Sequence, residues 1–157
     1  MTRLFDKLRA APAVLFVCSG NVVRSAFAEL YARHLGLDLP IHSAATTYRN
    51  PALFPETHAA LRERRVAPGL VASFRPRHLE DVVPGLPAGT LAFGMTRSHL
   101  ADLAVWPGAP VDAHLMLEVL GEERELADPV MDGVDFGATY RTLERCVTIL
   151  VRERRGP

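Results

Sequence analysis

The sequence is poor in cysteine and carries no excess charge of either sign. Its only cysteines, Cys18 and Cys146, are too few for the disulfide framework of a small secreted domain, so we expect two thiols in a reducing compartment. The 18 basic and 18 acidic residues cancel. A general nucleic-acid binder would show a basic excess, and we therefore expect no nucleic-acid partner.

Long apolar runs are also absent. The longest, such as residues 11–18, fall short of the roughly 20 apolar residues that a bilayer-spanning helix needs. Residues 1–10 alternate charged and apolar side chains and lack the apolar core of a signal peptide. These absences predict a cytoplasmic protein that does not bind membranes.

What remains is the composition of an ordinary globular protein. The 157 residues, 48% hydrophobic and 23% charged, suffice for one domain with a proper core. The sequence shows no internal repeat and no low-complexity linker. We therefore predict a single monomeric domain over residues 1–157, with residues 1–12 forming a loosely ordered N-terminal segment.

Strand and helix patterns alternate along the chain. Strands are predicted at 13–17, 40–45, 90–93 and 111–117, and helices at 25–35, 55–65, 79–83, 96–103 and 136–151. This alternation predicts an α/β fold with an open, mainly parallel four-stranded sheet, helices on both faces and a flavodoxin-like arrangement. Ligands of such sheets bind beyond the carboxyl ends of the strands.

The first loop, Cys18-Ser-Gly-Asn-Val-Val-Arg-Ser25, lies at that edge. A helix N-terminus presents unpaired N–H groups and a positive dipole end, which attract anions. Gly20 permits close backbone approach and Asn21 tolerates the left-handed region, so consecutive amides can turn inward. Arg24 adds a planar fork of donors for two phosphate oxygens. The loop therefore predicts a phosphate site.

Cys18 supplies a reactive group to this loop. It ends the strand and faces the same donors, and a field that attracts phosphate also stabilises a thiolate. The Ser25 hydroxyl is placed to hydrogen-bond the sulfur and to help it leave. The alternative is a chance Cys-x5-Arg match in an Arg-rich chain, with Cys18 an inert core residue. The buried strand before the loop, its Gly-Asn pair and the following helix favour a nucleophile.

These residues resemble the signature of the low-molecular-weight protein tyrosine phosphatase family: a strand, then Cys-x-Gly-Asn-x-x-Arg-Ser, then a helix. The family also has an Asp-Pro dipeptide before its last helix, which corresponds here to Asp128–Pro129. Ser43–Thr46 is similar to the family's Ser-Ala-Gly-Thr segment, whose serine supports the loop asparagine. Gly94–Ser98 is similar to its Met-Asp-x-Ser stretch.

The resemblance implies a bacterial phosphomonoester hydrolase that needs no metal or cofactor and acts on phosphotyrosine or other aryl phosphates, in proteins or small phosphoesters. It implies that the Cys18 thiolate attacks phosphorus to form a phosphocysteine while Asp128 protonates the leaving alcohol. Asp128 then acts as base for water, and Arg24 and the loop amides hold the phosphoryl oxygens. Without the resemblance, Asp128–Pro129 would be interpreted as a common turn dipeptide.

The predicted catalytic residues are Cys18, Arg24 and Asp128. The predicted phosphate-binding and substrate-binding residues are Ser19, Gly20, Asn21, Val22, Val23, Arg24, Ser25 and Tyr48. Tyr48 is expected to form one wall of the substrate cleft, although it could equally be a surface tyrosine.

The sequence departs from the family pattern in two ways. Val23 stands where many members carry a second cysteine, so no protective disulfide is expected beside Cys18. Val130 and Met131 stand where aromatic residues usually wall the cleft, so stacking on a substrate ring should be weaker. These changes indicate a divergent member whose preferred substrate can differ from phosphotyrosine.

Three alternatives stay open. An arsenate reductase of the thioredoxin-coupled type shares the fold and the loop, but it needs two further cysteines and only Cys146 is left. A phosphoarginine phosphatase tends to carry threonine where Val22 stands. A non-catalytic phosphate-binding module would keep the fold, although the presence of Cys18, Arg24 and Asp128 favours an enzyme.

Overall fold

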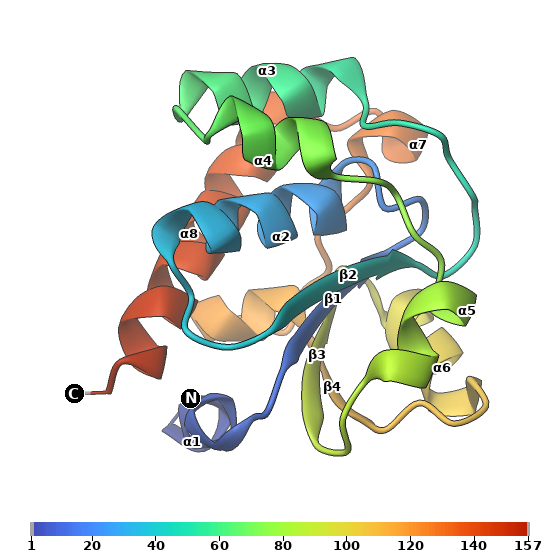
Figure 1. The fold of residues 1–157 in the computed structure, drawn as a ribbon, viewed down its shortest axis with the longest axis vertical. Helices are drawn as coiled ribbons and strands as arrows, with labels where there is room; N and C mark the ends of the chain where they lie inside the picture. Colours follow the sequence, from blue (N-terminus) through green and yellow to red (C-terminus); the bar gives the residue numbers. More distant parts are fainter. Residues whose placement is uncertain (1, 157) are drawn as a thin grey trace.

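The computed structural model describes residues 2–156 as an open sheet with helices on both sides (Figure 1). The strands are β1 (Val14–Cys18), β2 (Ile41–Ala45), β3 (Thr90–Gly94) and β4 (Val111–Leu115). Their order in the sheet is β2-β1-β3-β4, and every neighbouring pair is parallel. The predicted four-stranded α/β fold is confirmed, with a sheet that is wholly parallel.

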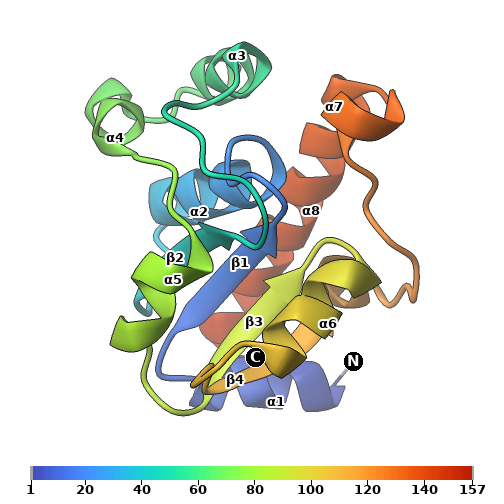
Figure 2. The ribbon, with the colours of Figure 1, turned by 90° about the vertical axis from the view of Figure 1, so that its right-hand side faces the viewer.

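Helices cover both faces of the sheet, as predicted (Figure 2). Helices α2 (Arg24–Leu35) and α8 (Phe136–Arg154) pack on one face, and α5 (Leu79–Val82) and α6 (Arg97–Val105) pack on the other. The remaining helices are α1 (Thr2–Ala10), α3 (Pro55–Glu63), α4 (Pro68–Ser73) and α7 (Pro129–Asp132), with 3₁₀ turns η1 (Val83–Gly85) and η2 (Met116–Leu120).

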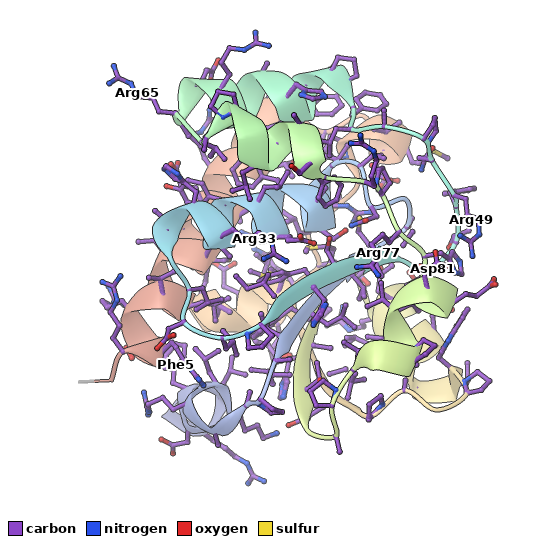
Figure 3. The ribbon with its side chains drawn as sticks, in the orientation of Figure 1. Phe5, Arg33, Arg49, Arg65, Arg77 and Asp81 are labelled. Atoms are coloured by element: carbon purple, nitrogen blue, oxygen red, sulfur yellow. The ribbon has the colours of Figure 1, made fainter. Side chains whose placement is uncertain are left out.

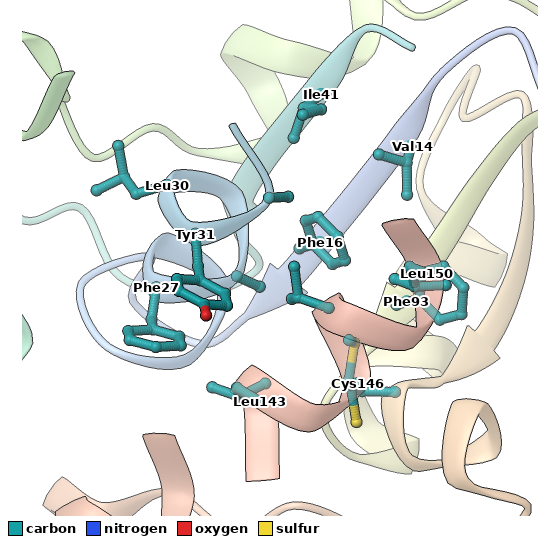
Figure 4. Close-up of a cluster of buried hydrophobic side chains, with 14 of the residues drawn as sticks. Val14, Phe16, Phe27, Leu30, Tyr31, Ile41, Phe93, Leu143, Cys146 and Leu150 are labelled. Carbon is teal, nitrogen blue, oxygen red and sulfur yellow. The ribbon is translucent and has the colours of Figure 1, made fainter. Parts of the chain in front are cut away.

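Alternating side chains of β1 divide the core in two. Phe16 belongs to the larger cluster, which α2 and α8 cover, and Leu15 belongs to the smaller one beneath α5 and α6. Figure 4 shows Phe16 and Phe93 of the sheet beside Leu143 and Cys146 of α8. The continuous apolar run of β1 thus reflects burial on both faces.

Residues 1–12 were predicted to form a loosely ordered segment, and the described part of it, residues 2–12, differs from that prediction. The structure has helix α1 there, with Leu4 and Leu8 buried in the larger cluster. The Arg154 guanidinium of α8 also donates to three carbonyls at the C-terminal end of α1, at 2.8–3.2 Å. The alternation of charged and apolar residues here is that of an amphipathic helix, whose apolar side α8 covers.

Other elements also differ from the prediction, among them the fourth strand, α4 and α7. The fourth strand ends at Leu115 instead of continuing to residue 117, because the 3₁₀ turn η2 begins at Met116. Gly121, with a φ of 76°, caps the end of η2. Helix α4 was not predicted, since it has six residues and none of them is buried. Only Leu70 and Val71 of this helix pack against the larger cluster, and six residues are too few to show a helical period in the sequence.

The strand order determines where a ligand can bind. Strand β2 pairs with one edge of β1, and β3, which comes later in the chain, pairs with the other edge. The carboxyl end of β1 therefore lies at a topological switch point, which is the usual ligand position in open parallel sheets. Cys18 is the last residue of β1.

Candidate active site

A pocket of about 340 Å³ opens at the carboxyl end of β1. Its walls come from the β1–α2 loop, the segment at residues 48–55, and the start of α7. It is lined by Cys18, Ser19, Gly20, Val22, Val23, Arg24, Tyr48, Arg49, Asn50, Ala52, Leu53, Phe54, Pro55, Asp128, Val130 and Met131. The structure thus brings all three predicted catalytic residues and Tyr48 to one cavity.

Asn21 and Ser25 lie beneath the loop, with fully buried side chains that do not line the pocket. Asn21 adopts a left-handed φ of 56°, and its side-chain nitrogen donates to the hydroxyls of Ser25 (2.8 Å) and Ser43 (2.9 Å). The predicted binding set included both residues. Their side chains support the loop from within, and Ser43 supports the asparagine as the resemblance implied.

The hydrogen-bond directions around Cys18 follow from this network. The Asn21 Oδ1 accepts the backbone N–H of Arg77, so its amide nitrogen must face the serines. Ser25 Oγ accepts one of those amide hydrogens and can therefore donate its own to Cys18 Sγ, 2.9 Å away. The Ser25 backbone N–H also points at the sulfur, at 3.4 Å. Two donors thus stabilise negative charge on Cys18.

The loop keeps its backbone donors free. Gly20 O accepts from Asn50 Nδ2 (3.0 Å), and Val22 O accepts from Thr57 Oγ1 (2.8 Å). Within residues 2–156, the backbone N–H groups of residues 19–23 form no hydrogen bond to a protein acceptor. Gly20 permits the contact with Asn50, because a Cβ there would lie 2.9 Å from Asn50 Nδ2 and would displace that side chain. Backbone donors that are free in this way can serve as an anion-binding nest in the loop between Cys18 and Arg24.

Arg24 joins this loop to the segment that carries Asp128. Its side chain is 2–3% exposed, and Nη1 donates to the Leu126 carbonyl at 2.8 Å. Nη2 lies 3.4 Å from Asp128 Oδ2. The other carboxylate oxygen accepts the Val130 N–H at 2.9 Å, so Asp128 caps the short helix α7. The contacts of Arg24 with Leu126 and Asp128 thus hold the Asp128 segment against the loop that carries Cys18.

His99 was missed by the sequence reasoning. It is buried at the start of α6, where Nδ1 accepts the Thr96 N–H (3.1 Å) and Nε2 lies 3.0 Å from Ser19 Oγ. Burial, together with the nearby positive charge of Arg24, lowers the pKa of His99 to about 4. The Thr-x-x-His spacing could have indicated the cap. Nothing in the sequence indicates the contact with Ser19, 80 positions away.

The rim of the pocket is apolar on one side and charged on the other. Tyr48 and Met131 are 53% and 68% exposed. Arg49 pairs with Asp81 at 2.9 Å, and Figure 3 shows these two side chains together at the molecular surface. In the described part of the chain, no three His, Cys, Asp or Glu side chains gather as a metal site would require, and no helix is long and apolar enough to cross a membrane.

The sequence matches no family model, and no curated protein matches it. Solved structures do match. The YwlE arginine phosphatase, in a mutant with a phosphorylated active-site serine, is 23% identical, with a TM-score of 0.75 over 92% of this chain and 96% of that one. A low-molecular-weight phosphotyrosine phosphatase from Vibrio cholerae O395 gives 22% identity and a TM-score of 0.74, covering 93% and 98% of the two chains.

The tyrosine phosphatase Wzb from Escherichia coli K30, in complex with sulphate, is 19% identical, with a TM-score of 0.72 over 90% of this chain and 97% of that one. In all three cases the match extends over nearly the whole of both chains, so it concerns the entire fold. The chain therefore has the fold of the low-molecular-weight protein tyrosine phosphatases.

Proposed function

We propose that the chain is a phosphomonoester hydrolase that acts on aryl phosphates, including phosphotyrosine, through a phosphocysteine intermediate on Cys18. The observation that carries this proposal is that, within the described residues, the backbone N–H groups of residues 19–23 have no protein acceptor, in a loop whose two ends, Cys18 and Arg24, line one pocket. Tyrosine and arginine phosphatases among the similar structures support the same reaction class.

In the first step, Cys18 Sγ attacks phosphorus and the bond from phosphorus to the leaving oxygen breaks. Asp128 transfers its proton to that oxygen, which departs as an alcohol or phenol. The loop amides and Arg24 stabilise the charge on the three remaining phosphoryl oxygens. Asp128 suits this role because it lines the pocket opposite the loop and its side chain is partly exposed.

In the second step, water attacks the phosphocysteine and the sulfur–phosphorus bond breaks. Asp128 takes a proton from the water, and inorganic phosphate is released. The Ser25 hydroxyl stabilises the departing thiolate, because the contact with Asn21 already directs its hydrogen toward the sulfur. The proton from water replaces the one that Asp128 gave in the first step, so the Cys18 thiolate and the protonated Asp128 are both restored.

The walls of the pocket favour a flat apolar group on the substrate. Tyr48, Val130 and Met131 all line the cavity and are exposed, so a phenyl ring can cover them. Phosphoarginine is the second candidate, since two of the similar structures are named YwlE arginine phosphatases. Val22 lines the pocket where that branch tends to carry threonine, which favours an ester.

The structure offers no support for the arsenate reductase alternative. That chemistry needs cysteines that relay a disulfide, and the described chain has only Cys146 besides Cys18. Cys146 lies in the core between α8 and the sheet, and burial raises its pKa to about 12 (Figure 4). A buried, protonated thiol cannot act as the resolving group.

Hydrolysis of p-nitrophenyl phosphate in the presence of EDTA tests the proposal. We expect turnover in the wild type, none in Cys18→Ser, and a loss of about 10²–10⁴-fold in Asp128→Ala. Asp38→Ala, which changes an exposed acid that does not line the pocket, should retain wild-type activity. Parallel assays with phosphotyrosine and phosphoarginine peptides distinguish the two substrate classes. Phosphate binding without turnover would instead support a non-catalytic module.

A further inference from the structure

The mechanism above leaves one hydrogen-bonded pair at the pocket unused. Ser19 follows the nucleophile and lines the cavity, whereas His99 lies behind it at the start of α6. Their side chains are 3.0 Å apart, from Ser19 Oγ to His99 Nε2. A buried histidine that contacts a residue of the anion-binding loop calls for a physical explanation.

The direction of this hydrogen bond follows from the partner of the other ring nitrogen. The Thr96 backbone N–H can only donate, and it points at His99 Nδ1 at 3.1 Å. Nδ1 must therefore be the unprotonated nitrogen, and the ring hydrogen sits on Nε2. That hydrogen is donated to Ser19 Oγ, which leaves the hydroxyl hydrogen of Ser19 free to be donated elsewhere.

We propose that His99 is a positioning residue that makes the Ser19 hydroxyl a dedicated donor to a phosphoryl oxygen in the pocket. This inference rests on the proposed function of the same site. The arrangement repeats that around Ser25, whose oxygen accepts from Asn21 so that its hydrogen faces the Cys18 sulfur. One serine thus serves the nucleophile and the other serves the group being transferred.

The surroundings of His99 keep it in the required state. The ring is buried against the turn between β3 and α6, and burial and the charge of Arg24 both disfavour a second proton. A charged imidazolium would carry a hydrogen on Nδ1 and would clash with the Thr96 N–H. The neutral ring can donate its Nε2 hydrogen to Ser19 Oγ and accept the Thr96 N–H at Nδ1, which accounts for both contacts.

Protection of Cys18 by inorganic phosphate tests this inference without depending on turnover. Iodoacetate labels Cys18, while buried Cys146 stays unlabelled, and phosphate in the pocket slows the labelling. We compare the phosphate dissociation constants of the wild type, Ser19→Ala, His99→Asn and the double variant. His99→Asn keeps an oxygen to accept the Thr96 N–H, but its side chain is too short to reach Ser19.

We expect Ser19→Ala to weaken phosphate binding about tenfold, because it removes one hydrogen bond to a charged group. His99→Asn should weaken it by up to the same factor, because the Ser19 hydroxyl loses the contact that directs its hydrogen toward the phosphate. The double variant should be no weaker than Ser19→Ala, since His99 acts through Ser19. Ser19→Thr, which retains the hydroxyl, should bind phosphate within about threefold of the wild type if one hydrogen bond is conserved. Ser98→Ala, a change at an exposed serine of the same helix, should leave binding unchanged.

Dissociation constants of both single variants within twofold of the wild type would overturn the inference, as would fully additive losses in the double variant. If His99→Asn does not fold, Ser19→Ala and Ser19→Thr still decide whether this hydroxyl is a phosphate donor. Failure of phosphate to protect Cys18 in the folded wild type would instead refute the proposed function. The two failures are therefore distinguishable.

Discussion

At the scale of single residues, Asn21 has the largest number of constraints in the loop. It combines a left-handed backbone with three side-chain hydrogen bonds, to Ser25, to Ser43 and from the Arg77 N–H. Asparagine tolerates positive φ better than most residues, and its amide offers both donors and an acceptor. The Gly-Asn pair of the sequence therefore encodes the loop shape and the polarity of the contacts around the sulfur.

Asn21→Ala should lower the free energy of unfolding by about 2–4 kcal/mol, because buried partners lose their hydrogen bonds and the left-handed backbone becomes strained. The turnover of an aryl phosphate should fall at least tenfold, as Ser25 loses the contact that directs its hydrogen. Urea unfolding and steady-state kinetics measure the two effects. Asn21→Gly, which accepts positive φ, is the matched control. Equal stability of the two variants would show that backbone strain contributes nothing.

At the scale of elements, the start of α6 links the sheet to the loop. His99 accepts the Thr96 N–H as part of a capping box and contacts Ser19 with its other nitrogen. A helix that begins at residue 96 was predicted from the sequence, since threonine before an apolar run is a helix-start signal. The role of His99 was not predicted, because a cap residue shows no trace of its distant partner in sequence spacing.

The depressed pKa of His99 predicts an acid-sensitive fold. In the unfolded chain a histidine titrates near 6.5, whereas in the folded protein it titrates at about 4. Between these values the unfolded state binds more protons than the folded state, so the free energy of unfolding falls as the pH drops below about 6.5. Above that pH the stabilising contribution of His99 is fully present. Over this range the group contributes about 3 kcal/mol at most.

Urea unfolding at pH 7.5 and at pH 4.5 measures this contribution, with His99→Asn as the comparison. We expect the variant to lose less stability than the wild type on acidification, because asparagine does not titrate. Parallel pH profiles for the two proteins would contradict the assignment of the acid sensitivity to His99.

At the scale of the whole molecule, the sheet topology assembles the site from distant parts of the chain. The Cys18 loop was recognisable locally, because strand, loop and helix are adjacent in sequence. That Asp128 reaches the same pocket was predicted only from the family resemblance, since no local pattern encodes a contact across more than 100 positions. The structure accounts for this proximity by the order of the strands and by the contact between Arg24 and the Leu126 carbonyl.

Contacts between residues far apart in sequence also hold the first and last helices of the described chain together. Arg154 donates to the carbonyls of Leu8, Arg9 and Ala11 and, through Nε, to that of Asp38 at 3.1 Å. Charge-assisted bonds to carbonyls at the C-terminal end of α1 should stabilise its docking on α8.

Arg154→Ala should therefore lower the free energy of unfolding by about 1–3 kcal/mol, with turnover of aryl phosphate unchanged because Arg154 lies outside the pocket. Urea unfolding and hydrogen exchange of α1 measure the effect. Arg152→Ala, which removes an exposed arginine of the same helix, should have little influence. Comparable losses in the two variants would point to a general effect of charge rather than to the clamp on α1.

Arg24 divides its two terminal nitrogens between different partners, the Leu126 carbonyl and the Asp128 carboxylate. The first contact anchors the guanidinium, and the second is longer and is the one an incoming anion can replace. A phosphate group that takes over this second nitrogen would release the carboxylate while the arginine stays in place. Occupation of the site would thereby prepare its own proton donor, and an empty site would keep that donor restrained.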